Sequence, residues 1–145
     1  MPDAHPFKSN MKRLLFAFIG LLYAIGIFAQ KEDFNNCAAA FLDQKMIVDD
    51  YSPEGKCVVS SGAHGTLTVR PVTINAGEAP VPGEKIKFKV ALRGSGDRAL
   101  MLLSEKTYNE VDIQDILKQC QKGDRIVLLT LEREWALPHH EILIE

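Results

Sequence analysis

The sequence predicts a mainly β protein, a β-sandwich of about seven strands with one short helix. Residues 85–93 alternate apolar and charged side chains, as a strand does when one face meets a core and the other meets water. Only residues 112–120 place apolar side chains at helical spacing. Clusters of Gly, Pro, Asn and Asp separate the remaining apolar segments, and this spacing is typical of all-β domains.

The N-terminal half of the domain is predicted to hold one short helical turn and three strands. The run NCAAAFL at residues 36–42 favours a single helical turn. Strands are expected at residues 45–48 and 56–60 on either side of the turn DDYSPEGK. A third strand is expected at residues 66–74, where Leu67 and Val69 would face the core, before the loop NAGEAPVPG.

The C-terminal half is predicted to hold four strands. In residues 85–93 the core face would carry Ile86, Phe88, Val90 and Leu92, and the lysines between them would face water. Residues 98–104 are apolar on both faces, which favours a central strand. Residues 125–134 and 141–145 lie close enough in the chain to pair as a hairpin.

The single helix is predicted from Asp112 to Cys120. Ile113, Ile116, Leu117 and Cys120 form its apolar stripe. Either Asn109 or Asp112 can cap its N-terminus, and Gly123 stands where a left-handed residue would end it. So short a helix is unstable alone, so it must pack on the sheets.

Residues 11–29 have the pattern of a cleavable export signal. Lys12 and Arg13 precede sixteen uncharged, mostly apolar residues that end at Ala29. This run is shorter than the roughly 20 residues of a membrane-spanning helix. Cleavage after Ala29 is expected, and an uncleaved membrane anchor is the alternative. Met11 is the more natural start, so residues 1–29 are assigned to an extension plus signal and residues 30–145 to one periplasmic or extracellular domain.

The domain after the signal is acidic. Of 17 Lys and Arg residues three precede residue 30, and of 19 Asp and Glu residues one does, which leaves 14 against 18. The basic residues are also spread singly along the strands. Nucleic acid is therefore not expected as a partner, because its binding depends on clustered cations that displace counterions.

Three cysteines remain in this exported domain: Cys37, Cys57 and Cys120. An oxidising compartment allows at most one internal bridge among them. The preferred pair is Cys37 with Cys57, which would tie the N-terminal segment to a strand and stabilise the fold by ~3 kcal/mol. The alternative is three small buried apolar side chains, and this reading is preferred for Cys120.

No residue pattern indicates catalysis. His64, His139 and His140 are the histidines of the domain, and adjacent histidines rarely chelate one metal without further ligands. There is no phosphate-binding glycine loop and no nucleophile motif. The sequence therefore predicts a protein that is not an enzyme and needs no metal or other cofactor.

Trp135 and Leu137 are the candidate contact residues. They flank Ala136 in a short loop between the last two strands. A tryptophan at a loop tip is typical of interaction hot spots. The alternative is that the loop folds back and buries both side chains on the domain itself.

In the C-terminal third, the helix DIQDILKQCQKGD, the strand RIVLLTLE, a hairpin and a terminal ILIE follow one another. This order resembles that of the last periplasmic domain of GldM, the gliding-motility and type IX secretion protein. The matching positions are Ile113, Ile116, Leu117, Lys122, Gly123, Asp124, Arg125, Ile126, Leu131, Leu137, Ile142 and Ile144.

This resemblance covers about residues 66–145, and it is closest over residues 112–145. It implies an immunoglobulin-like β-sandwich that makes protein contacts in the periplasm. The expected function is therefore a non-catalytic protein-interaction module of the cell envelope, in contact with the membrane only if the signal is uncleaved. A small-ligand or cell-wall-associated binding domain is the alternative, and a small metal-dependent hydrolase is a more distant one.

Overall fold

The computed structural model describes residues 36–75 and 77–145, which belong to one compact unit, Phe34–Glu145. The predicted signal, residues 11–29, and the ten residues before it lie outside the described residues. No helix within the described ranges is long and apolar enough to cross a membrane.

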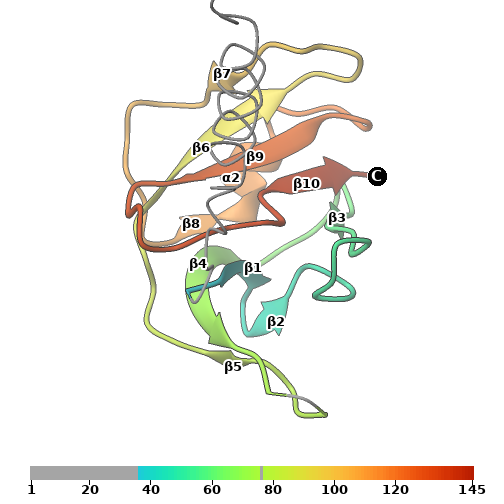
Figure 1. The fold of residues 1–145 in the computed structure, drawn as a ribbon. Helices are drawn as coiled ribbons and strands as arrows, with labels where there is room; N and C mark the ends of the chain where they lie inside the picture. Colours follow the sequence, from blue (N-terminus) through green and yellow to red (C-terminus); the bar gives the residue numbers. More distant parts are fainter. Residues whose placement is uncertain (1–35, 76) are drawn as a thin grey trace, which may run out of the picture. The chain divides into compact units, whose positions relative to one another are not determined.

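The described chain is mainly β, with two sheets and one short helix (Figure 1). The first sheet has the order β2-β1-β4-β5, and β8 also pairs with β4. Neighbouring strands of this first sheet are antiparallel. Its strands are β1 (Ala38–Leu42), β2 (Lys45–Met46), β4 (Thr66–Thr73), β5 (Val81–Pro82) and β8 (Val111–Asp112).

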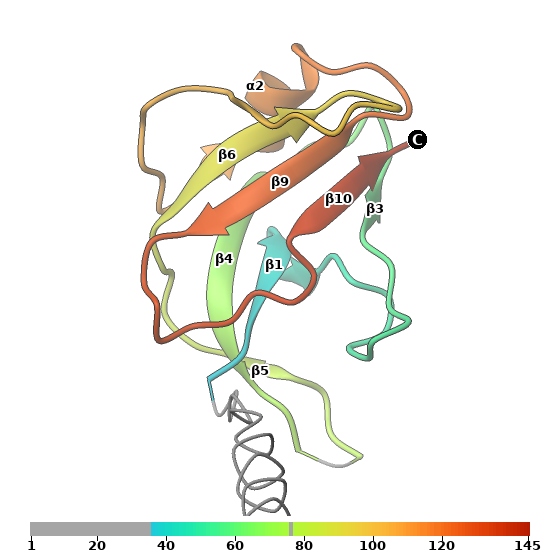
Figure 2. The same cartoon turned by 45° about the horizontal axis from the view of Figure 1, so that its top comes forward.

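The second sheet has the order β3-β10-β9-β6-β7. Figure 2 shows β6, β9, β10 and β3 side by side in front of β4 and β1. The antiparallel β9–β10 hairpin confirms the predicted pairing of the last two strands. The strands of this sheet are β3 (Val58–Val59), β6 (Phe88–Arg93), β7 (Met101–Leu102), β9 (Arg125–Thr130) and β10 (Glu141–Ile144). Strand β3 runs parallel to β10, and the other neighbouring strands are antiparallel.

The main hydrophobic core is built from both sheets and the helix, and a second, small cluster contains Ala39, Phe41 and Val72. Strand β6 contributes as predicted, because Ile86, just before the strand, and Phe88, Val90 and Leu92 within it are all 0 to 8% exposed. Leu67 and Val69 of β4 are also fully buried. The largest fully buried side chains are Phe88, Leu67, Ile113, Ile116, Ile126, Leu128, Ile142 and Ile144.

The predicted helical turn at residues 36–42 is wrong, because this segment contains β1. It pairs antiparallel with β4, from Ala38 opposite Pro71 to Leu42 opposite Leu67. Ala38, Ala39 and Ala40 are almost completely buried, so both faces of the strand are covered. Packing between two neighbours outweighs the helix propensity of a short alanine run, which cannot form a stable helix alone.

The predicted central strand at residues 98–104 is also wrong. Only β7 forms there, and it lies at the edge of the second sheet with β6 as its one strand neighbour. Its side chains are exposed. The described residues form ten strands rather than about seven, because five of the strands are pairings of only two residues.

The helix α2 spans Ile113–Leu117 and lies at one end of the two sheets (Figure 2). Ile113 and Ile116 are fully buried, and Leu117 and Cys120 pack partly buried against the same core, as predicted. Gly123 has the expected left-handed φ of 94°, but it lies in a later turn. It does not end the helix, whose C-cap is Lys118.

Asp112 is the N-cap of α2, which decides between the two residues that the sequence offered. Its carboxylate accepts a hydrogen bond from the Gln114 backbone N–H at 2.9 Å. We expect Asp112→Ala to lower the free energy of unfolding by about 1 kcal/mol, because that N–H loses its acceptor. Urea denaturation measures the loss. Asp112→Asn, which keeps an acceptor oxygen, should unfold close to the wild type, and equal losses for both variants would contradict the capping role.

Candidate functional site

A groove of about 650 Å³ opens where the two sheets meet at the edges formed by β2 and β3. Most of its lining side chains are apolar, and several of them belong to the main core or pack against it. The groove therefore reaches the space between the sheets. Its lining residues are Leu42, Asp43, Gln44, Lys45, Met46, Ile47, Val58, Val59, Ser60 and Ala63.

Both strands at this groove have backbone groups that their own sheet does not use. On β3, the carbonyls of Cys57 and Val59 accept hydrogen bonds from β10 at 2.9 Å, so the backbone of Val58 between them points the other way. The antiparallel bridge between Val48 and Cys57, in which the Asp49 N–H donates to the Lys56 carbonyl at 3.1 Å, lies on that side and directs the Val58 N–H toward Ile47. On β2, the Ile47 N–H donates to the Ala40 carbonyl at 2.9 Å. The alternation of the ladder turns the N–H and C=O of Met46 away from β1, toward the groove.

The rim of the groove carries one carboxylate that is already engaged and one available cation. Asp43 accepts a hydrogen bond from the Thr66 backbone N–H at 2.8 Å. Gly65 allows this approach, because a Cβ there would lie 2.6 Å from the Asp43 carboxylate, and its φ of 128° also favours glycine. Lys45 is exposed, and no acidic side chain within residues 36–75 and 77–145 pairs with it. The rim thus carries one negative charge, at Asp43, and one positive charge, at Lys45.

A smaller hollow of about 190 Å³ continues from the groove toward α2 and shares Ala63 with it. Leu117 and Lys118 of the helix region line this hollow. Lys118 is paired with Asp115 at 2.9 Å, and this hydrogen bond raises the pKa of the lysine. The two hollows together run from the β1–β2 turn to the helix.

The loop with the predicted contact residues, which we call the strap (residues 131–140), is tied to the start of β1. The Ala38 N–H donates to the Ala136 carbonyl at 2.8 Å, and the Ala136 N–H donates to the Asn36 carbonyl at 3.0 Å. Trp135 and Leu137 are half-buried and pack against the main core. This geometry favours the alternative in which the strap covers the domain itself, and the role of Trp135 and Leu137 in binding a partner stays a prediction.

Tyr51, His139 and Cys57 make a packed cluster beside the strap. The rings of Tyr51 and His139 meet edge to face at 5.3 Å, and the Tyr51 hydroxyl donates to the Ala38 carbonyl at 2.9 Å. Burial raises the pKa of the Tyr51 hydroxyl, and it raises the pKa of the Cys57 thiol to about 11. Burial also raises the pKa of the Cys120 thiol to about 11. Both thiols are therefore protonated at neutral pH and are poor nucleophiles.

The structure contains no disulfide between Cys37 and Cys57. The Cys57 sulfur lies 3.7 Å from the His139 carbonyl oxygen, and Cys37 lies beside Tyr51. A bond between the two sulfurs needs Cβ atoms about 4 Å apart, so both side chains would have to meet in that geometry. The pairing stays a prediction for the oxidised protein.

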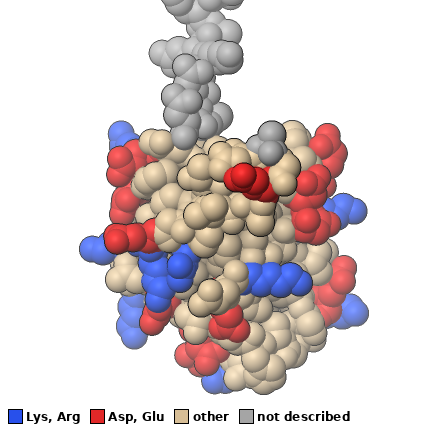
Figure 3. Space-filling model, turned by 90° about the horizontal axis from the view of Figure 1, so that it is seen from below, with Lys and Arg blue, Asp and Glu red and all other residues tan. Residues whose placement is uncertain are grey.

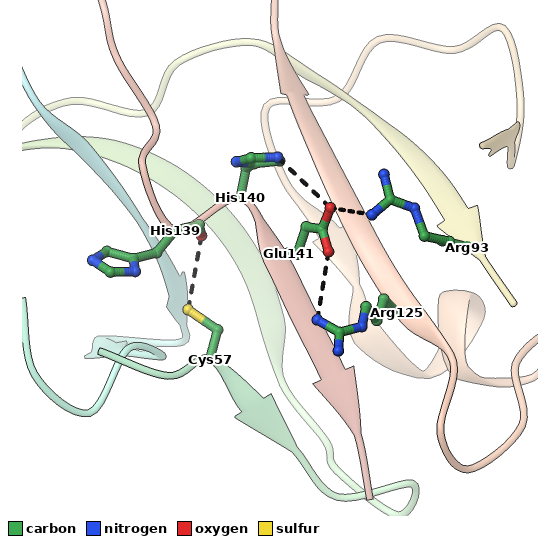
Figure 4. Close-up of polar contacts among 6 residues, drawn as sticks. All are labelled: Cys57, Arg93, Arg125, His139, His140 and Glu141. Carbon is green, nitrogen blue, oxygen red and sulfur yellow. Dashed lines mark hydrogen bonds and ion pairs between the residues drawn. The ribbon is translucent and has the colours of Figure 1, made fainter. Parts of the chain in front are cut away.

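Glu141, the first residue of β10 after the strap, is the centre of a polar cluster that joins three strands of the second sheet (Figure 4). Glu141 of β10 pairs with Arg93 of β6 at 2.5 Å and with Arg125 of β9 at 3.5 Å. Arg93 and Arg125 stand directly opposite each other, a repulsive pair that the carboxylate offsets. His140 lies 3.9 Å from the same carboxylate. The cluster therefore has a structural explanation as a cross-strand ion-pair network.

The three histidines considered as metal ligands do not form a ligand set. Within residues 36–75 and 77–145, no group of three His, Cys, Asp or Glu side chains is arranged to hold a metal ion. His139 meets the Tyr51 ring edge to face, and His140 faces Glu141, so these two neighbouring histidines have different partners. His64 is exposed in the turn before β4.

A second, polar hollow of about 770 Å³ lies near the N-terminal end of β6. Glu110 pairs there with Lys85, and this hydrogen bond lowers the pKa of the Glu110 carboxyl. Two cations and two anions line the hollow, so it has no net charge. Its lining residues are Arg70, Glu84, Lys85, Thr107, Tyr108, Asn109 and Glu110.

Comparisons with family models, with curated proteins and with solved structures found no match to this chain. The fold and the groove define a mainly β protein whose two sheets share one core and leave a groove open at one edge. Acidic and basic side chains lie near one another around an uncharged centre on the face drawn in Figure 3, so that face has no large patch of one charge.

Sequence reasoning missed the groove. Lys45 and Val58 stand in two-residue strands, which are too short for a periodic pattern to identify their neighbours. The only signal was the pair of turns around residues 49–56 and 61–65, which indicated short strands at this edge.

Proposed function

We propose that this protein is an exported, non-catalytic protein-interaction module of the cell envelope. Its two sheets form an immunoglobulin-like β-sandwich, and the groove between β2 and β3 binds an extended segment of a protein partner. The observation that carries this proposal is an apolar groove beside the edge strand β2, where the backbone N–H and C=O of Met46 point away from β1.

Strand addition is the binding mode that such a groove fits. An added strand gains main-chain hydrogen bonds from an open edge, and alternate side chains enter the pocket beside it. Here the Met46 backbone supplies the open edge, and Leu42, Ile47 and Val59 supply apolar contacts for the inward side chains. The bound segment should therefore alternate apolar side chains with polar ones.

The charge of the rim adds a second requirement. Lys45 stands exposed beside the groove, while the Asp43 carboxylate is held by the Thr66 N–H. An acidic side chain in the partner segment would pair with Lys45 where it lies farther from the Asp43 carboxylate, which keeps its negative charge. The partner chemistry is thus an extended apolar segment with acidic residues on its polar side.

The compartment in this proposal comes from the sequence of residues 11–29. The order of helix, glycine turn, strand and closing hairpin is the basis of the resemblance to the GldM domain, a protein that makes contacts in the periplasm. That resemblance supports a role in binding proteins, and we extend no gliding or secretion activity to this chain.

A synthetic peptide can test the groove directly. We expect acetyl-Val-Asp-Val-Thr-Val-Asp-Val-amide to shift the backbone amide NMR signals of Met46, Val58 and Ser60 in the isotope-labelled protein. Lys45→Glu should weaken this binding about fivefold, the scale of one exposed charge pair of ~1 kcal/mol. Lys87→Glu is the control, because Lys87 is also exposed, directly precedes β6 and does not line the groove. This variant should bind the peptide as the wild type does.

Two results would overturn the groove assignment. One is a set of signal changes that leaves Met46, Val58 and Ser60 unaffected at saturating peptide. The other is unaltered binding by Ala63→Phe, because a phenyl ring at the junction of the two hollows should obstruct the groove.

Small-ligand or cell-wall-associated binding is the second candidate function. It is favoured by the polar hollow around Lys85 and Glu110, where Tyr108 and Asn109 add an aromatic ring and an amide. Titration with a soluble cell-wall glycan would then shift the signals of Tyr108 and Asn109 and leave those of Val58 and Ser60 in place.

A further inference from the structure

We draw no further inference here: the strongest candidate, the apolar edge of the second sheet at strand β7, where Leu100, Met101 and Leu102 are exposed, carries nothing because no contact within the described part of the chain shows what covers it.

Discussion

Phe88→Ala should lower the free energy of unfolding by about 3 to 5 kcal/mol, the range for removing a buried aromatic ring. Phe88 is fully buried in β6, and its ring lies 6.1 Å from the ring of Tyr108. The truncation leaves a cavity between the two sheets that the surrounding strands can fill only in part. Urea denaturation followed by circular dichroism measures the change.

Lys87→Ala is the matched control, one residue before Phe88 and on the opposite face. Its side chain is exposed, so the free energy of unfolding should change by less than about 0.5 kcal/mol. Equal losses for the two variants would show that the alternation of residues 85–93 does not correspond to a buried and a solvated face.

Trp135→Ala should lower the free energy of unfolding by about 2 to 3 kcal/mol. Trp135 is half-buried against the main core, so its expected cost is below that of a fully buried aromatic. The strap would stay attached through Ala136, whose backbone bonds to Asn36 and Ala38 do not involve the indole. Urea denaturation measures this loss, and Glu134→Ala at the exposed neighbouring position should have little effect.

The same variant separates the two interpretations of Trp135. If this side chain anchors a partner instead, its truncation should leave the melting temperature nearly unchanged and weaken association by about 2 kcal/mol or more. Unaltered stability together with lost capture of an envelope protein would therefore contradict the packing role derived from the structure.

Two of the sequence-based predictions succeed because they rest on local patterns. The alternation around Phe88 and Val90 specifies which side chains are buried whatever strand lies beside them. The stripe of α2 and its Asp112 cap lie within one short segment, so the information for both is contiguous in the chain.

Two other predictions, the helical turn at residues 36–42 and the central strand at residues 98–104, are wrong because each depends on which strands lie beside the segment. The alanines of β1 have no strand pattern of their own, and they become strand because β4 pairs along their whole length. The apolar run around Met101 has the composition of a central strand, yet only β6 lies beside it. Amino-acid composition does not indicate how many strands pair with a segment, because the backbone groups that form the hydrogen bonds are the same for every non-proline residue.

The sequence by itself determined the mainly β class, the single short helix and the buried face of β6, because periodicity encodes which side chains avoid water. Only the tertiary structure decided the parallel pairing of β3 with β10 and the attachment of Ala136 to the start of β1. Those contacts join segments far apart in the chain. The groove depends on the β3–β10 pairing, which places β3 at the edge of the second sheet.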